Sequence, residues 1–398
     1  LRAEALEAIG DPAAVAAYRA AADAAGGQDW HELRAKGALA QVKQGDPAGG
    51  LAALEGVHPV TVEGRLCEAL AYSGAAALGF GDPAVGTRKA AAARRLALES
   101  GDTASIVVAS WAQAAAAHAR GELHGSVWAD LMETRDVPGL AVRVFDGHLC
   151  MTQRFLYGAS PYPKVIEFAD AIADEARRLG AARGQAFGVT LRGEAELLAG
   201  ELDAADEHLK LGGALHRRFG GAVGEALSLQ RRAELALERG RRDEAADLLD
   251  EALDLARQTD IGFHLFDRIY GTRLRLAPDP EAGLAALEDA QQSVRGLLET
   301  CPGCRITFAV PAAIAAARGG QLELAERYGE SCEYLANVVM RLPAWHAALE
   351  EVRGHMARAR GQDAAVAARH FAAAARGFRA AGHRLDARRC DTLAAGPA

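Results

Sequence analysis

The sequence has few aromatic residues and no long uncharged apolar segment. Aromatic side chains account for 6% of its 398 residues, although half of all residues are hydrophobic. Alanine supplies much of this apolar content, and alanine has the highest helix propensity of the amino acids. Valine, isoleucine and threonine form no long alternating run, so we expect almost no β-sheet. No uncharged apolar run reaches the roughly 18 residues that a membrane span requires, so we expect no membrane partner.

The sequence also lacks an excess of basic residues and a dense set of cysteines. Its net charge is −8 and its pI is near 5.9. A nucleic-acid-binding domain normally has a basic footprint, so we expect no direct contact with nucleic acid. Six cysteines are too sparse for a disulfide scaffold, and the start resembles no secretory signal. We therefore expect a cytoplasmic setting, and we interpret the start at Leu1 as that of a fragment.

Sequence motifs for common enzyme chemistry are missing. There is no G-x-x-x-x-G-K-S/T loop for phosphates and no G-x-G-x-x-G turn after a strand. Neither H-E-x-x-H nor G-x-S-x-G occurs. Amide-based recognition is scarce because Asn337 is the only asparagine. We expect a chain that is not an enzyme, needs no cofactor and does not hydrolyse ATP.

One turn motif recurs along the whole chain. It consists of a glycine, then an acidic or polar residue, then an alanine-rich segment. Glycine can end a helix with positive φ, aspartate can cap the next helix, and proline fits its first position. After two steps of 35 and 36 residues, the motifs lie 39–41 residues apart. They begin at Gly10, Gly45, Gly81, Gly121, Ser160, Gly200, Gly240, Asp279, Gly320 and Gly361.

The segments between these motifs have the periodicity of amphipathic helices. In 243–257, apolar residues recur every three or four positions. They include Ala245, Leu248, Leu249, Ala252, Leu253 and Ala256. In 163–178, Val165, Phe168, Ala169, Ile172 and Ala176 form a similar stripe. This spacing is typical of a helix with one buried face. Each period of about forty residues therefore predicts two antiparallel helices.

Small residues stand where paired helices approach each other in tetratricopeptide repeats. The position seven before the turn holds Ala38, Gly74, Ala114, Gly193, Ala233, Ala313 and Gly354, and the position five after it holds Ala205, Ala245, Ala325 and Val366. The chain thus resembles a degenerate variant of this repeat, longer than the usual 34 or so residues. With segments 1–23 and 369–390, it resembles the helical-repeat region of large actinobacterial transcriptional regulators of the LuxR or antibiotic-regulatory type, in which an ATPase module precedes the repeats.

The resemblance implies a fold and a function. The fold is all-α, a single right-handed α-solenoid over residues 1–398 with about nine helix pairs, whose first helices line a concave groove. The function is that of a non-catalytic interaction or sensor module, which binds a protein or peptide segment in the groove. A small-molecule inducer is the alternative ligand, and a homo-oligomer is a further expectation. The ATP-binding and DNA-binding motifs of such regulators do not occur in this chain.

Two zones, 143–162 and 260–276, are less regular than the rest. The small position before the turn is occupied there by Gln153 and Arg273, and broken local rules often indicate function. Arginine and aromatic residues also favour partner contacts, although a bulkier core is the alternative interpretation. The predicted groove residues are Gln153, Arg154, Tyr157, Arg192, Gln230, Phe266, Tyr270 and Arg273.

Two further clusters have mainly structural interpretations. Cys301 and Cys304 form a C-x-x-C pair without a surrounding thioredoxin-like pattern, so we interpret them as structural cysteines. Zinc binding with Cys332 and a histidine such as His264 or His346, or redox sensing, are the alternatives. A basic cluster is interleaved with acidic residues, and we interpret it as a solvated helix end. It consists of Arg231, Arg232, Arg239, Arg241 and Arg242.

Overall fold

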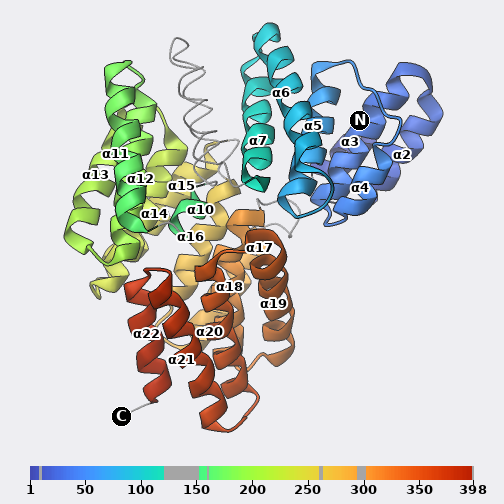
Figure 1. Ribbon diagram of the computed structural model, residues 1–398. Coiled ribbons are helices and arrows are strands. Elements are labelled where there is room, and N and C mark those ends of the chain that lie inside the picture. Colours follow the sequence, from blue (N-terminus) through green and yellow to red (C-terminus); the bar gives the residue numbers. More distant parts are fainter. Residues whose placement is uncertain (9–10, 121–151, 159–160, 260–262, 294–301, 397–398) are drawn as a thin grey trace. The chain divides into compact units, whose positions relative to one another are not determined.

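The computed structural model describes residues 1–8, 11–120, 152–158, 161–259, 263–293 and 302–396. All regular secondary structure in these ranges is helical, as expected from the alanine-rich composition. The described residues divide into two compact units. The first contains residues 1–8 and 11–120, and the second contains the other ranges. Figure 1 labels the helices of both units.

The first unit has an alanine-rich helical core. Its helices are α1 (Arg2–Ala8), α2 (Ala13–Ala25), α3 (Gly27–Lys43), α4 (Pro47–Ala53), α5 (Val62–Ala77), α6 (Pro83–Ser100) and α7 (Thr103–Ala119). Between α5, α6 and α7 the buried hydrophobic residues are almost all alanines, joined by Leu66 and Ile106. Because alanine adds little bulk, these three helices can pack closely against each other.

The second unit is a longer series of helices, in which successive helices pack against each other. It contains α10 (Gln153–Leu156), α11 (Tyr162–Arg178), α12 (Ala182–Ala199), α13 (Leu202–Arg218), α14 (Ala222–Glu238), α15 (Arg242–Arg257), α16 (Phe263–Leu276), α17 (Pro280–Ser293), α18 (Pro302–Arg318), α19 (Leu322–Tyr334), the π-helix η1 (Leu335–Met340), α20 (Pro343–Ala359), α21 (Ala364–Ala380) and α22 (Arg384–Ala395). The predicted packing in neighbouring helix pairs is confirmed for the described residues.

The recurring motif separates helices as predicted. Its described glycines, which are Gly45, Gly81, Gly200, Gly240, Gly320 and Gly361, have φ between 64° and 86°. The side chain of Asp46 accepts a hydrogen bond from the Gly49 amide at 2.8 Å, and Asp82 caps α6 in the same way. Positive φ is costly for residues other than glycine, so these positions fix the helix ends. Gly10 and Gly121 lie outside the described residues.

The predicted amphipathic stripes are buried. In α15 the whole expected set is buried, namely Ala245, Leu248, Leu249, Ala252, Leu253 and Ala256. In α11, Val165, Ala169, Ile172 and Ala176 are buried, while Phe168 is half-buried. Both helices therefore pack against the rest of the unit through the face that the period indicated.

Small residues at the repeat positions permit close helix contacts. A Cβ atom added to Gly193 on α12 would lie 2.8 Å from Cγ of Leu209 on α13. A Cβ atom on Gly354 of α20 would lie 2.6 Å from Cε1 of Phe371 on α21. Such distances are too short for carbon atoms, so both positions require glycine while their neighbours stay in place.

The second unit closes on itself, because its last helices contact its first ones. Helix α22 packs against α12, and Nε2 of His383 lies 3.1 Å from the carbonyl oxygen of Leu156. The amide of Ala344 donates to the carbonyl of Tyr157 at 3.3 Å. These contacts join positions far apart in the sequence, so the helices between them surround an interior.

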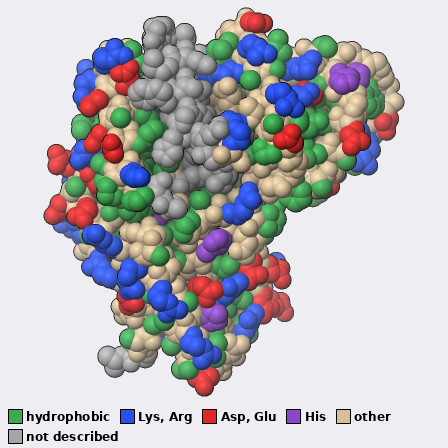
Figure 2. Space-filling view, viewed as in Figure 1, with side chains coloured by type: hydrophobic (Ala, Val, Ile, Leu, Met, Phe, Trp, Pro, Cys, Tyr) green, Lys and Arg blue, Asp and Glu red, His purple; other side chains and the backbone are tan. Residues whose placement is uncertain are grey.

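Two surface properties bear on the predicted partners. In the described ranges no helix has both the length and the apolar character of a membrane span. On the face shown in Figure 2, acidic and basic side chains are interspersed and neither sign forms a broad area.

Candidate functional site

A cavity of about 830 Å³, partly open to solvent, lies between the helices of the second unit. Its wall comes mainly from alternate helices, namely α14, α16, α18, α20 and α22, together with Tyr157 and the end of α12. The intervening helices contribute little, such as Arg242 from α15 and Phe378 from α21. Cavities of roughly 300–1,000 Å³ are typical of small-molecule sites.

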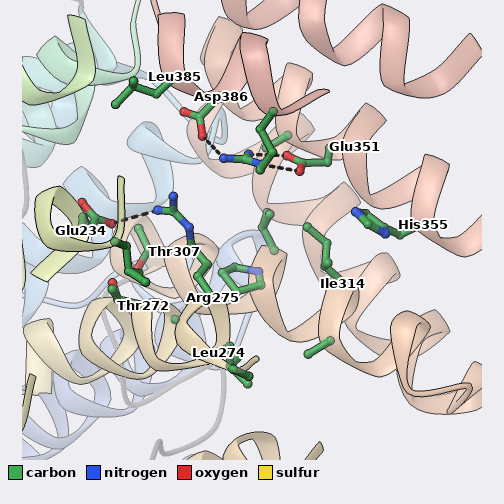
Figure 3. A pocket seen from close by; sticks show the side chains of 18 of the residues that line it. Glu234, Thr272, Leu274, Arg275, Thr307, Ile314, Glu351, His355, Leu385 and Asp386 are labelled. Carbon is green, nitrogen blue, oxygen red and sulfur yellow. Dashed lines mark hydrogen bonds and ion pairs between the residues drawn. The ribbon is translucent and has the colours of Figure 1, made fainter. Parts of the chain in front are cut away.

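The cavity wall combines aliphatic surface with many charges. Leucine, valine, isoleucine and alanine side chains line much of it, and Ile314 of α18 lies among them (Figure 3). Seven arginines line the wall: Arg231, Arg242, Arg268, Arg275, Arg318, Arg358 and Arg389. Five carboxylates face them: Glu234, Glu238, Asp279, Glu351 and Asp386. The wall thus has more cationic than anionic side chains, in a chain whose net charge is −8.

A buried carboxylate links three alternate helices, α12, α14 and α16, at one side of the cavity. Glu194 of α12 accepts a hydrogen bond at 2.7 Å from Nε of Arg231 on α14. It also accepts one at 3.4 Å from Nη1 of Arg268 on α16. All three side chains are 1–3% exposed. Burying charges is costly unless they are paired, so these contacts fix the positions of α12, α14 and α16 relative to each other.

The buried cluster continues towards the cavity through Glu234. Its carboxylate accepts from Arg231 at 2.7 Å and from Arg275 at 3.4 Å, and Figure 3 shows the pair with Arg275. Burial alone would raise the pKa of Glu234, but Arg231 and Arg275 outweigh it and hold that pKa below its ordinary value. Glu234 is therefore ionised at neutral pH and serves as an anchor for two arginines.

A second ion cluster lies on the α20 and α22 side of the cavity. Arg389 donates to both oxygens of Glu351, at 2.8 and 2.7 Å, and also to Asp386 (Figure 3). Burial opposes ionisation of Asp386, but Arg389 and then His383 outweigh it and keep the pKa of Asp386 well below its usual range. The bidentate geometry makes this the most strongly constrained charge pair of the wall.

A single histidine lines the cavity among the described residues, His355 of α20. Its ring packs edge-on against Phe371, with the ring centroids 5.0 Å apart. Burial, which Glu351 opposes, lowers the pKa of His355 to about 4. The imidazole is consequently neutral at physiological pH.

Tyr157 and Trp345 close the wall where the two ends of the unit meet. Their rings are stacked with centroids 4.3 Å apart and planes inclined by 16°. The hydroxyl of Tyr157 accepts a hydrogen bond from Arg231 at 3.3 Å. Burial raises the pKa of Tyr157, which therefore remains a neutral phenol. The stack joins the segment before α11 to α20 and supports the closure of the unit.

The structure brings two of the predicted groove residues to this cavity. Tyr157 and Gln230 line it. The described wall does not include Arg192, Phe266, Tyr270 or Arg273. Arg192 pairs with Asp170 and Glu196, while Arg273 pairs with Asp250. The side chains of Gln153 and Arg154 lie outside the described residues.

Of the thiols considered from the sequence, Cys304 and Cys332 are not among the residues that line the cavity. Cys304 and Cys332 are fully buried, and burial raises the pKa of the Cys332 thiol. Cys301 lies outside the described residues, and the described ranges contain no group of metal-ligating side chains that could hold an ion.

The interpretation of the basic cluster as a solvated helix end is wrong for Arg231. This side chain is buried between Glu194 and Glu234, whereas Arg241 of the same cluster is exposed. The sequence does contain a signal for this buried cluster. Glu194, Arg231 and Arg268 follow one another at intervals of 37 residues. This interval is close to the repeat period and places them on consecutive cavity-side helices. The interleaved acidic residues concealed it.

A proline within α18 further shapes the wall. Pro311 has no amide hydrogen to donate to the carbonyl of Thr307, one helical turn earlier. That carbonyl oxygen would lie 2.2 Å from a Cβ atom on Gly271 of α16. All three residues line the cavity. Glycine at 271 therefore permits the close approach of α16 and α18 at this point.

No protein-family model matches the chain, and no curated protein matches it either. The cavity and its side chains are therefore the features of this chain that point to a function.

Proposed function

We propose that this chain is a non-catalytic sensor module that holds a small molecule in the cavity of its second unit. The observation that carries the proposal is the cavity itself, whose wall is assembled from residues 157 to 393. A ligand in this position would contact helices from both ends of the unit. Its binding energy could therefore favour the closed arrangement over other arrangements, which is how a ligand shifts a conformational population.

The chemistry of the wall supports binding rather than catalysis. Glu234 and Asp386 are ion-paired and have lowered pKa values. His355 is neutral and lies against an aromatic ring, and no cysteine is among the described wall residues. A general acid or base works best with a pKa near the working pH, and these groups do not meet that condition.

A small molecule fits the site better than a protein segment does. The wall is built from alternate helices of a unit whose ends contact each other, and the cavity volume of about 830 Å³ is in the range of small-molecule sites. The exposed large apolar side chains of the described residues are scattered, as for Val60, Leu98, Leu211 and Tyr334, while protein partners favour contiguous patches. The proposal extends to a right-handed α-solenoid within a transcriptional regulator, as the repeat resemblance implies, in which the ligand would be an inducer.

A thermal-shift screen of the purified chain against small metabolites tests the proposal. We expect at least one compound to raise the melting temperature, because a ligand that binds only the folded state stabilises it. The Ile314→Trp variant, which adds bulk inside the cavity, should lose that shift. The Leu211→Trp variant places the same side chain on an exposed site and should retain it. Hits that stabilise both variants equally would contradict binding in the cavity.

A further inference from the structure

The buried edge of Arg268 is an unused hydrogen-bonding site at the cavity. Its Nη1 has the 3.4 Å contact with Glu194, but its Nε and Nη2 are buried without a hydrogen-bond partner among the described residues. A buried donor without a partner destabilises the folded state, and a charged donor does so more strongly. Glu194 is already engaged with Arg231 at 2.7 Å, so the part of the chain that the structure describes supplies no second strong acceptor for Arg268.

The two unpartnered atoms form one side of the guanidinium group. Nε and Nη2 point in parallel, and this edge matches two oxygens of a carboxylate, phosphate or sulfonate. A neutral ligand would leave the charge of Arg268 poorly compensated in a buried position. An anionic group would supply the missing acceptors and the missing charge together.

Two neighbouring groups on the wall have unmet hydrogen bonds as well. Gln230 donates from Nε2 to Thr272 at 2.9 Å, while its Oε1 has no partner among the described residues. Nε1 of Trp345 is likewise unpartnered. Both side chains are at least nine-tenths buried and both line the cavity. Arg268, Gln230 and Trp345 thus line the cavity and have buried polar atoms without partners among the described residues, donors at Arg268 and Trp345 and an acceptor at Gln230.

We propose, on the basis of the proposed function, that the ligand is an organic anion with an apolar body whose charged oxygens bind Nε and Nη2 of Arg268. The cationic excess of the wall attracts the anion, and the aliphatic side chains around Ile314 contact its body. The unpartnered atoms are covered by neighbouring side chains, so these must move aside as the ligand binds.

A matched pair of fluorescent probes tests this inference. 1-Anilinonaphthalene-8-sulfonate is an anion, and N-phenyl-1-naphthylamine has the same ring system without the sulfonate. We expect the intact chain to bind the sulfonate about tenfold more tightly than the neutral probe, the effect of one charge-assisted contact. The Arg268→Gln variant should lose this preference while it keeps its affinity for the neutral probe. Arg268→Lys should keep only part of it, because lysine lacks the planar fork.

The control variant is Arg192→Gln, which removes the same charge from α12 at a position outside the cavity wall. It should bind both probes as the intact chain does. Should Arg268→Gln fail to fold by circular dichroism, the intact chain still decides the matter through salt. Added salt should weaken binding of the sulfonate and not of the neutral probe.

The outcomes separate this inference from the proposed function. Equal affinity for the two probes in the intact chain, with both lost in Ile314→Trp, would overturn the anion preference and leave a ligand-binding cavity. A sulfonate preference that survives in Arg268→Gln would overturn the role of Arg268. Binding of both probes that Ile314→Trp does not reduce would mean that the cavity is not their site, and the proposed function would then fail as well.

Discussion

Helices α14 and α15 are neighbours of nearly equal length, yet they bury different kinds of side chain. Helix α15 buries only alanines and leucines along a single stripe. Helix α14 is buried on most of its surface, and Glu225, Gln230 and Arg231 are among its buried residues. The difference follows from position, because α14 lies between the outer helices and the cavity while α15 faces solvent on one side. An amphipathic stripe thus describes an outer helix fully and a cavity-side helix only in part.

The same contrast applies to how charges contribute to stability. On the outer side, Asp203 pairs with Arg239 while its own side chain is fully exposed. On the cavity side, Glu194 and Arg231 are almost completely buried. Exposed pairs are worth about 0–1 kcal/mol, whereas removing one member of a buried pair costs about 3–5 kcal/mol. The cavity-side charges should therefore dominate the sensitivity of the second unit to substitution.

The largest expected effect comes from removing Glu194. Glu194→Ala leaves Arg231 and Arg268 buried without their shared carboxylate, and we expect it to destabilise the folded state by about 3–5 kcal/mol. Urea denaturation followed by circular dichroism measures this change. Asp203→Ala on the outer helix should change the free energy of unfolding by less than about 0.5 kcal/mol. If the two variants lost similar amounts of unfolding free energy, the proposed difference between cavity-side and outer-side ion pairs would be wrong.

Acid should destabilise the folded second unit through two buried histidines, one on an outer helix and one on a cavity-side helix. Burial, with a smaller contribution from Arg183, lowers the pKa of His216 on α13 to about 3, and the pKa of His355 on α20 is about 4. The unfolded chain binds a proton near pH 6.5 and the folded chain does not, so stability is complete above 6.5 and falls as the pH drops towards these values. Each histidine contributes at most about 1.4 kcal/mol per pH unit.

The acid prediction is checked by measuring the free energy of unfolding between pH 7 and pH 4.5. His216→Leu should reduce the slope, because one of the two titrating groups is gone. If the intact chain and the double variant His216→Leu, His355→Leu had the same slope, other groups would have to account for the acid sensitivity.

The smallest of the three effects is expected from a glycine substitution at the close contact between α12 and α13. Gly193→Ala on α12 would place a Cβ atom 2.8 Å from Leu209 on α13, and we expect a loss of about 1–3 kcal/mol from overpacking. In Gly283→Ala on α17 the nearest atoms are 3.8 Å away. That substitution should stabilise the helix by about 0.5–1 kcal/mol because alanine restricts the unfolded chain. Thermal denaturation of both variants compares them, and a destabilised Gly283→Ala would argue against the spacing account.

Much of the secondary structure could be predicted from the sequence, and less of the site. The turn motifs placed helix boundaries at Gly45, Gly81 and Gly200 because positive φ and capping are local properties. The stripe of α15 was complete because one face of that helix is solvated. Tyr157 and Gln230 were predicted as groove residues and do line the cavity, but Arg268 was noted only as part of an irregular zone. Its importance depends on Glu194, which lies 74 residues away.

The sequence by itself determined that this chain is helical, where its turns lie and which small residues allow helices to pair. These features depend on backbone preferences and on contacts between adjacent helices, so a short window of residues contains them. Only the tertiary structure decided that the second unit closes on itself, with Leu156 beside His383, and that charged residues of several helices surround one cavity. The physical reason is that burial and charge pairing depend on distances in space between residues that the sequence keeps far apart.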